Sequence, residues 1–346
     1  MDFELNCPLP LRHETIQMAH GGGGRIMREL LELVMLPAFR NEALAARHDS
    51  AVVPMGAGRI AFTTDTYVVK PRFFPGGDIG ELAVYGTVND LAMAGARPLY
   101  LSVGMILEEG YPIAELRQVV QSMRRAADRC GVKIVTGDTK VVDRGKGDGI
   151  FINTAGVGLV PEGLVVGPGS VRPGDAVLVS GDVGRHGIAV MSVREGIAFE
   201  TPIESDCAPV HGLAQALLQG GVQVHCMRDP TRGGLAAVLN EIATDGHVGV
   251  EVVEAEIPVP PGVAGACEML GLDPLYVACE GRMVVFVPEA EAARALALLW
   301  ATPGGEGAAR IGAVTATGPG TVLLRTVLGT RRILDLLSGE QLPRIC

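Results

Sequence analysis

The stretch LYLSVGMILEEGYPIAELRQVVQSMRRAADRCGVKIVT, residues 99–136, contains the pattern that decides the fold. Its first part, 99–107, is a strand-like apolar run, and 112–130 repeats apolar residues at helical spacing. Gly131 follows as the C′ residue of a helix would, and 132–136 reads as a second strand. A strand, a helix and a strand in this order predict a mixed α/β protein.

The same alternation continues on both sides of this stretch. The first part of the chain predicts a helix at 25–36, which ends before a proline, strands at 59–69 and 150–160, and a helix at about 79–95. The second part predicts strands at 176–180, 222–226, 248–254, 275–287 and 308–327, and helices near 186–196, 207–219, 233–244 and 289–300. Both halves are therefore expected to be mixed α/β.

A chain of 346 residues exceeds the roughly 250 to 300 residues at which single cores stop growing, so two domains are expected. Proline and glycine cluster in PEGLVVGPGSVRPGD, 161–175, where the periodicity lapses, and we place the boundary there. The predicted parts are a glycine-rich segment with its helix at 1–40, an N-terminal domain at 41–165, a C-terminal α/β domain at 170–334 and a mobile tail at 335–346.

Charge and composition exclude several classes of protein. The net charge of −10 argues against non-specific binding to nucleic acid, which depends on basic patches. The first ten residues, MDFELNCPLP, do not resemble a signal peptide, and no run of 18 apolar residues exists, so we expect a cytoplasmic protein that does not enter the membrane. Seven widely spaced cysteines without a Cys-x-x-Cys pair argue against a disulfide framework or a zinc knuckle.

Four aspartates stand beside small or polar residues, mostly where predicted strands end. They are Asp65 in FTTDTYVV, Asp90 in TVNDLAMAGA, Asp138 in TGDTKVV and Asp229 in RDPTRGG. Carboxylates that converge from several segments can hold hydrated Mg²⁺ against a nucleoside triphosphate. Asp65, Asp138 and Asp229 can equally cap helices or turns, which a single aspartate does more often than bind metal.

Asp90 is the hardest of the four to explain by local structure. It lies inside an otherwise apolar predicted helix, next to Asn89, where an unpaired carboxylate is costly. Asp78, by contrast, begins the sequence Asp-Ile-Gly-Glu, which is a capping box and accounts for the residue structurally. We therefore leave Asp78 out of the candidate site.

Three further features have two interpretations each. The glycines 21–24, directly before the helix at 25–36, can bring backbone N–H groups to phosphates or can form a flexible hinge. Lys140 follows Asp138 at a predicted strand end. Glu280, in the strand-like run YVACEGRMVVFV, can lie at an exposed edge or be buried as a base with a raised pKa.

Taken together, the motifs match a known family almost from end to end. They are MAHGGGGR, FTTDTYVV, FFPGGDIG, TVNDLA, ILEEG, TGDTKVV, FINTAG, VSGDVGRHG, RDPTRGG, CEMLG and the terminal LPRIC. The chain resembles the HypE family of hydrogenase-maturation proteins, in the superfamily of aminoimidazole ribonucleotide synthetase and selenide-water dikinase. The glycine-rich and aspartate motifs are shared across that superfamily, whereas LPRIC at the end singles out this family.

The resemblance implies two domains of the aminoimidazole ribonucleotide synthetase type and a homodimer that pairs through the N-terminal domain. It also implies that this domain binds ATP and Mg²⁺ under the glycine-rich segment. The implied ATP-binding residues are Gly22, Gly23, Gly24, Asp65, Asn89, Asp90, Asp138 and Thr139, and the implied metal ligands are Asp65, Asp90, Asp138 and Asp229.

The resemblance further implies a reaction on Cys346, which would receive a carbamoyl group from a carbamoyltransferase of the HypF type. ATP would phosphorylate the carbamoyl oxygen, and loss of phosphate and of the nitrogen protons would leave a thiocyanate. The cyanide would pass to an iron-carrying complex of the HypC–HypD type and become a ligand of nickel-iron hydrogenase. By the same similarity, Lys140 and Glu280 lie where the tail inserts, and we expect Glu280 to be the base, with His225 as an alternative.

The chain departs from the family pattern at Lys70, where relatives often carry an acid, and at the four consecutive glycines. Two other functions remain as alternatives. One is another ATP-using member of the superfamily, such as a selenide or aminoimidazole synthetase, which needs no terminal cysteine. The other is a non-catalytic scaffold that uses Cys346 only to dock or to bind iron.

Overall fold

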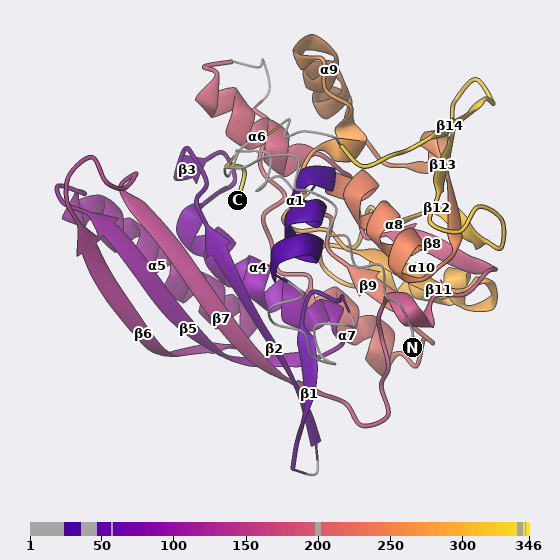
Figure 1. The fold of residues 1–346 in the computed structure, drawn as a ribbon, viewed down its shortest axis with the longest axis horizontal. Helices are drawn as coiled ribbons and strands as arrows, with labels where there is room; N and C mark the ends of the chain where they lie inside the picture. Colours follow the sequence, from indigo (N-terminus) through magenta and orange to yellow (C-terminus); the bar gives the residue numbers. More distant parts are fainter. Residues whose placement is uncertain (1–23, 36–46, 57, 198–201, 338–341, 343) are drawn as a thin grey trace, which may run out of the picture.

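A computed structural model describes residues 24–35, 47–56, 58–197, 202–337, 342 and 344–346 (Figure 1). Two β-sheets, one from each half of the chain, form the centre of the molecule, and a short hairpin of β3 (Phe73–Phe74) and β4 (Gly77–Asp78) stands beside the first. No helix within the described residues is long and apolar enough to cross a membrane. The mixed α/β class predicted from the sequence is confirmed.

The first sheet has five strands and comes from the N-terminal half. Its order is β1 (Ala51–Met55), β2 (Gly58–Tyr67), β7 (Ile150–Val160), β5 (Arg97–Glu108) and β6 (Lys133–Val142). All neighbours are antiparallel except β5 and β6, which are parallel because a helix connects them. That helix is α5 (Ile113–Cys130), and it ends at Gly131 with the left-handed φ of 67° expected of a C′ glycine.

Two helices cover one face of this sheet, as Figure 1 shows: α4 (Ile79–Met93) and α5. Asp78 caps α4, because its carboxylate accepts hydrogen bonds from the backbone N–H groups of Gly80 and Glu81 at 2.7 and 3.1 Å, as the sequence predicted. Helix α4 is apolar on nearly all sides and almost wholly buried, since it also contacts the C-terminal half through α7 and β9. It therefore carries its polar residues into the interior.

The second sheet has seven strands. Its order is β14 (Arg331–Ile333), β13 (Val322–Arg325), β10 (Gly249–Val253), β12 (Ala309–Thr315), β8 (Asp175–Val179), β11 (Val284–Pro288) and β9 (Cys226–Arg228). The helices of this half are α6 (Arg185–Arg194), α7 (His211–Gln219), α8 (Gly234–Asp245), α9 (Pro261–Leu270) and α10 (Ala292–Trp300).

Several predicted elements differ from the structure. The strand expected at 222–226 is β9, three residues long and shifted toward the C-terminus, and 308–327 is two strands separated by a turn. The helix expected at 25–36 consists of α1 (Arg25–Leu30) followed by a short π-helix, Leu31–Met35. Strands β1 and β14 and helix α9, which begins at a proline, were not predicted.

Candidate active site

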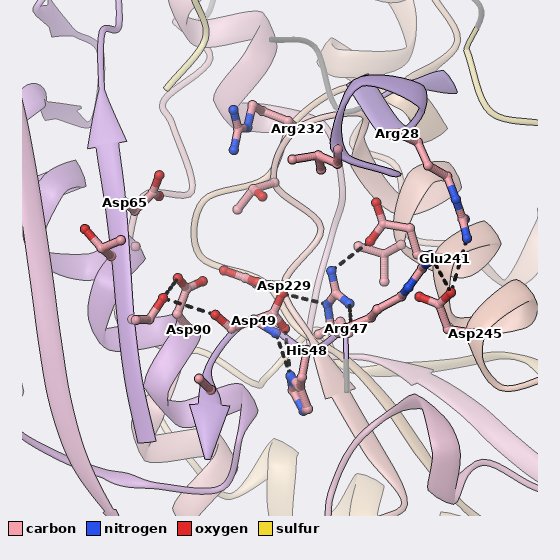
Figure 2. A pocket seen from close by; sticks show the side chains of 18 of the residues that line it. Arg28, Arg47, His48, Asp49, Asp65, Asp90, Asp229, Arg232, Glu241 and Asp245 are labelled. Carbon is pink, nitrogen blue, oxygen red and sulfur yellow. Dashed lines mark hydrogen bonds and ion pairs between the residues drawn. The ribbon is translucent and has the colours of Figure 1, made fainter. Parts of the chain in front are cut away.

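A cavity of about 480 Å³ opens between the two halves of the chain. Side chains from α1, β2, α4, α8 and the loop after β9 line it, so that residues far apart in sequence meet there (Figure 2). Three of the four predicted aspartates, Asp65, Asp90 and Asp229, are among the lining residues. The prediction that these carboxylates converge is confirmed for these three.

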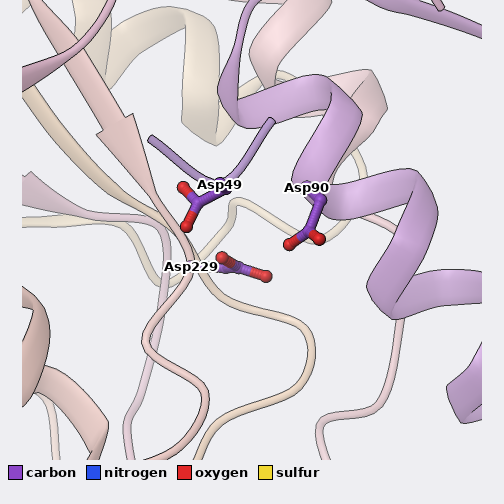
Figure 3. Close-up of side chains that lie close together, drawn as sticks. All are labelled: Asp49, Asp90 and Asp229. Atoms are coloured by element: carbon purple, nitrogen blue, oxygen red, sulfur yellow. The ribbon is translucent and has the colours of Figure 1, made fainter. Parts of the chain in front are cut away.

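Three carboxylates form the centre of the cavity: Asp49, Asp90 and Asp229 (Figure 3). Asp49 lies two residues before the start of β1, Asp90 projects from α4, and Asp229 follows β9. One oxygen of each lies within 4.8 Å of the others, which is a spacing that a single cation can bridge. Asp65 lies at the side of this group and lines the same cavity.

The three carboxylates repel one another in a buried setting, and this shows in their pKa values. Burial raises the pKa of Asp90 well above its usual range, and the charges of Asp229 and Asp49 add to the effect. Burial, followed by the charge of Asp49, raises the pKa of Asp229 to about 8. Burial acts in the same direction on Asp49, but Arg228, 2.7 Å away, holds the pKa of Asp49 below its usual value. A cation at the centre would relieve this repulsion.

The donor set fits a hard divalent cation such as Mg²⁺. Carboxylate oxygens are the ligands that Mg²⁺ prefers in proteins. The Oδ2 atom of Asp49 is buried without a well-formed hydrogen bond from the described residues, and only Nδ1 of His48 lies near it, at 3.5 Å, so it is available to a cation. The carboxylate of Asp90 accepts a 2.8 Å hydrogen bond from the hydroxyl of Thr63.

Basic residues line the opposite part of the cavity. Arg28 donates a hydrogen bond to Asp245 at 3.2 Å and to Glu32 at 3.0 Å, and Arg47 reaches Glu32 at 2.8 Å. Arg228 bridges the two parts, because it pairs with Asp49 on one side and with Glu241 on the other, both at 2.7 Å. An acidic centre beside arginines is suited to a polyanion that is bound through a cation.

Glu280 is buried, with 3% of its surface exposed, but it does not lie on a strand. The prediction of a strand over 275–287 is wrong for its first part, because β11 begins only at Val284. A Cβ atom at Gly281 would come 1.8 Å from the backbone oxygen of Asp206, so this glycine lets the segment around Asp206 lie tightly against the loop. The backbone N–H of Cys279 donates to Pro230 in place of a strand partner.

The setting of Glu280 is that of a strong base. Burial raises its pKa well above the usual range, and the charges of Asp229 and Asp65 add to the shift while Arg232 opposes it. Its Oε1 atom has no hydrogen-bond partner among the described residues. Of the two interpretations of Glu280, the buried one is confirmed.

The C-terminal segment lies against the same region. Leu342 and Ile345 are buried in a core cluster that both halves of the chain share, and Cys346 packs partly buried beside them. The backbone N–H of Val68 donates to a backbone oxygen of Cys346 at 3.0 Å, directly after β2. The negative charge of Cys346 is the largest influence that raises the pKa of Arg232, whose guanidinium Figure 2 shows turned toward the Asp65 side of the cavity.

Asp138, Thr139 and Lys140, which were predicted as residues of the same site, do not line this cavity within the single chain. They lie on β6, the outer strand at the far end of the sheet from β1 and β2. Lys140 donates a 2.6 Å hydrogen bond to Asp138, and both side chains are about 70% exposed. The sequence suggested that the strand ends near residue 136, whereas it continues along the sheet edge to Val142.

Asn89, predicted as an ATP-binding residue, does not line the cavity. Its amide oxygen accepts a hydrogen bond from the N–H of Val210 at 2.8 Å, and its nitrogen donates to the carbonyls of Ala208 and Glu280 at 3.1 and 3.5 Å. These contacts use the amide to fix the backbone beside Glu280. The residue therefore positions the site from outside the cavity.

The remaining predicted residues divide between the cavity and its surroundings. Gly24 is buried and lines the cavity, whereas Gly22 and Gly23 lie outside the described residues. His225, the alternative base, pairs with Asp175 at 2.8 Å and does not line the cavity.

Sequence reasoning missed Asp49 and Arg232. The first stands in a short polar stretch before β1, which resembles an ordinary loop, and only its ion pair with Arg228 and its closeness to Asp90 and Asp229 show its place. Arg232 belongs to the quoted motif RDPTRGG, so the signal for it was present in the sequence.

Comparison with known proteins gives a consistent result. The model for the AIR synthase related protein N-terminal domain matches residues 47–160, and the one for the C-terminal domain matches 172–325. Carbamoyl dehydratase HypE of Azotobacter vinelandii is 52% identical over 338 residues, which cover 98% of this chain and 99% of the relative.

Two solved structures are similar over nearly their whole length. The crystal structure of a hydrogenase maturation protein HypE in complex with ATP has 47% identity and a TM-score of 0.82, and the match covers 96% of this chain and 100% of that one. The crystal structure of a HypE–HypF complex has 48% identity and a TM-score of 0.85, with 89% and 99% covered. The fold thus consists of two domains of the AIR synthase type. The chain belongs to the HypE family, the carbamoyl dehydratases of hydrogenase maturation.

Proposed function

We propose that this protein uses ATP to dehydrate a carbamoyl group carried on the sulfur of its own Cys346. The thiocyanate that results would supply the cyanide ligand for the iron of nickel-iron hydrogenase. The observation that carries the proposal is the place of the C-terminal segment. The backbone of Cys346 is hydrogen-bonded to Val68, directly after the strand that carries Asp65 of the cavity wall, and the negative charge of Cys346 acts on Arg232 of the same wall.

The chemistry requires activation of a poor leaving group. The carbamoyl oxygen attacks the γ-phosphorus of ATP, and ADP leaves. Phosphate then departs from the carbon, two protons leave the nitrogen, and the carbon–nitrogen triple bond forms. Glu280 is placed to take a proton from that nitrogen, because a buried carboxylate with a raised pKa is a stronger base than an exposed one.

The crystal structure of a HypE protein with ATP supports placing the nucleotide in the cavity. Asp49, Asp90 and Asp229 would hold Mg²⁺, with Asp65 beside them, and the ion would neutralise charge on the phosphates. Arg28 and Arg47 supply positive charge on the other side of the same cavity.

Asp90→Asn should weaken Mg-ATP binding by about tenfold or more, because it keeps the side-chain volume and removes a charge that the cation needs. Calorimetric titration beside the thermal midpoint separates binding from folding. Asp78→Asn is the matched control, since it lies at the start of the same helix, outside the cavity, and asparagine also caps helices. Unchanged affinity in Asp90→Asn would remove the residue from the metal site.

A homodimer would give Asp138, Thr139 and Lys140 a place in the reaction. The face of the five-stranded sheet away from α4 and α5 exposes large apolar side chains, and the outer strand β6 adds more. They are Phe62, Tyr100, Ile106 and Leu159 on the face, and Ile134, Val135 and Val141 on β6. An exposed apolar face of this kind favours association. We infer that a second copy covers it and that Lys140 then acts in the partner's site.

Mixing two inactive variants tests this arrangement. The Lys140→Ala and Cys346→Ala copies should each be inactive alone. After subunit exchange about half of the dimers are mixed, and one of the two sites in each mixed dimer is complete, so up to about a quarter of the parent's active sites should be regained. Single-turnover dehydration measures the recovery, and light scattering confirms exchange. Mixed dimers without recovered activity would exclude action of Lys140 across the dimer.

The carbamoyl group would come from a HypF-type carbamoyltransferase, which the crystal structure of a HypE–HypF complex supports. The cyanide would then pass to an iron-carrying complex of the HypC–HypD type. Neither step needs nucleic acid or a membrane.

The dependence of ATP hydrolysis on carbamoylation tests the proposal against its alternatives. One equivalent of ATP should be hydrolysed for each carbamoylated Cys346, and little without the carbamoyl group. Hydrolysis driven instead by selenide or an aminoimidazole precursor would indicate another superfamily enzyme. No hydrolysis under any of these conditions would indicate a scaffold.

A further inference from the structure

The last residues of the chain are bound by side chains that have no part in the chemistry described so far. The guanidinium of Arg344 forms an ion pair with Asp148 and also donates to the backbone oxygen of Val68 at 3.0 Å. The carbonyl of Arg344 accepts from the backbone N–H of Lys70 at 3.2 Å and from Arg194 at 2.7 Å. Both ends of this one residue are therefore fixed.

The following residue is fixed from the other side. The carbonyl of Ile345 is hydrogen-bonded to Nε2 of His186 at 2.8 Å, and the Nδ1 atom of the same ring contacts the hydroxyl of Ser205 at 2.8 Å. His186 is fully buried, with Phe74 edge-on to its ring at 5.3 Å. The Ile345 side chain is 3% exposed. Because the His186 ring is held in place, its hydrogen bond to the Ile345 carbonyl allows the tail to bind in only one register.

The backbone of Arg344 shows that this position is imposed. Its φ is +54°, a left-handed conformation that is unfavourable for a residue other than glycine. Such a conformation persists where surrounding contacts over-determine it. Here the contacts are those of Asp148, Lys70 and Arg194.

The loop that carries Asp148 is itself held in place. Glu108, at the end of β5, accepts hydrogen bonds from the backbone N–H groups of Gly145 and Gly149, the latter at 2.9 Å. Asp148 also pairs with Lys70 at 3.4 Å, so its carboxylate lies between the ammonium group of Lys70 and the guanidinium group of Arg344. Its pKa stays below the usual value, because Arg344 and Lys70 together outweigh the effect of burial, so it is charged at neutral pH.

We propose that Asp148 and His186 are positioning residues that recognise the Arg-Ile pair before Cys346 and thereby set where its sulfur stands relative to the cavity. The tail-docking site consists of Val68, Lys70, Asp148, His186 and Arg194. This site binds Arg344 through the ion pair with Asp148. It binds Ile345 by burying the side chain and by the hydrogen bond between His186 and the Ile345 carbonyl. This inference rests on the proposed function for its role in catalysis, but docking itself needs neither ATP nor a carbamoyl group.

Hydrogen exchange at two amides reports docking directly, because the N–H groups of Val68 and Lys70 donate to the tail. In the full-length parent both amides should be protected. Asp148→Asn and Arg344→Gln should each lower this protection by about tenfold, since each removes one partner of a charge-assisted pair. In the double variant the protection of these amides should be no lower than in the single variant that loses more protection, because both substitutions remove the same ion pair.

Asp143→Asn is the matched control, an exposed aspartate on the same loop, and it should leave protection unchanged. Single-turnover dehydration of carbamoylated Cys346 is the second measurement, and it should slow in step with lost protection while Mg-ATP affinity stays the same. Full protection in Asp148→Asn, or additive losses in the double variant, would overturn the recognition. Lost protection with an unchanged dehydration rate would overturn its role in placing the sulfur and leave the proposed reaction standing.

Discussion

Cys346→Ala should fold, bind ATP and accept no carbamoyl group at all, so that the yield of thiocyanate falls to zero. The expectation rests on the contrast with the other described cysteines, Cys130, Cys207, Cys226, Cys267 and Cys279, all of which are buried. Burial raises the pKa of the thiol in each of the five, to about 12 in Cys130 and about 11 in Cys267. Since the thiolate is the nucleophile, these are poor acceptors.

Mass spectrometry of the intact variant after incubation with the carbamoyltransferase measures this. Cys267→Ala is the control, because it removes a buried thiol and should still take up one carbamoyl group. A carbamoyl adduct on Cys346→Ala would show that another residue, Cys7 included, is the carrier.

Glu280→Gln should slow dehydration of carbamoylated Cys346 by about 10² to 10⁴, the usual cost of losing a general base. The variant should fold, because glutamine is nearly the same size and its neutral amide is less costly to bury than an unpaired carboxylate. Single-turnover measurement at saturating ATP isolates the step from binding.

Glu256→Gln is the matched control, an exposed glutamate outside the cavity, and it should retain the parent rate. If Glu280→Gln also stays within a few-fold of the parent, Glu280 is structural. The base is then to be sought among the water molecules of the metal site, because His225 is paired with Asp175 away from the cavity.

The periodic elements of the fold could be predicted because their apolar spacing is local. Helices α4, α5 and α8 and strands β5, β7 and β10 lie within two residues or so of the expected ranges. Failures occurred where tertiary contacts decide. The loop around Glu280 has the composition of a strand, yet the close approach of the segment at Asp206 prevents pairing there.

The residues of the candidate site also divide into those that a local pattern predicts and those whose place depends on tertiary structure. Asp90 could be predicted because an unpaired carboxylate inside an apolar helix is costly. In the structure Thr63 donates a hydrogen bond to it, and Asp49 and Asp229 lie beside it as further candidate cation ligands. Asp138, for which capping was an equal interpretation, lies three strands away from β2 in the order of the sheet. Strand order is a property of the whole sheet, so no local pattern around Asp138 could show its distance from the cavity.

Mass analysis of the C-terminal peptide tests the central claim most directly. The protein is carbamoylated by the carbamoyltransferase, purified and incubated with Mg-ATP. The mass of the peptide that ends in Cys346 is then measured by mass spectrometry. The proposed function predicts that the carbamoylated peptide loses the elements of one water molecule, with release of one ADP and one phosphate for each peptide converted. A carbamoylated peptide that keeps its mass while ATP is consumed, or that loses the whole carbamoyl group and returns to the free thiol, would contradict it.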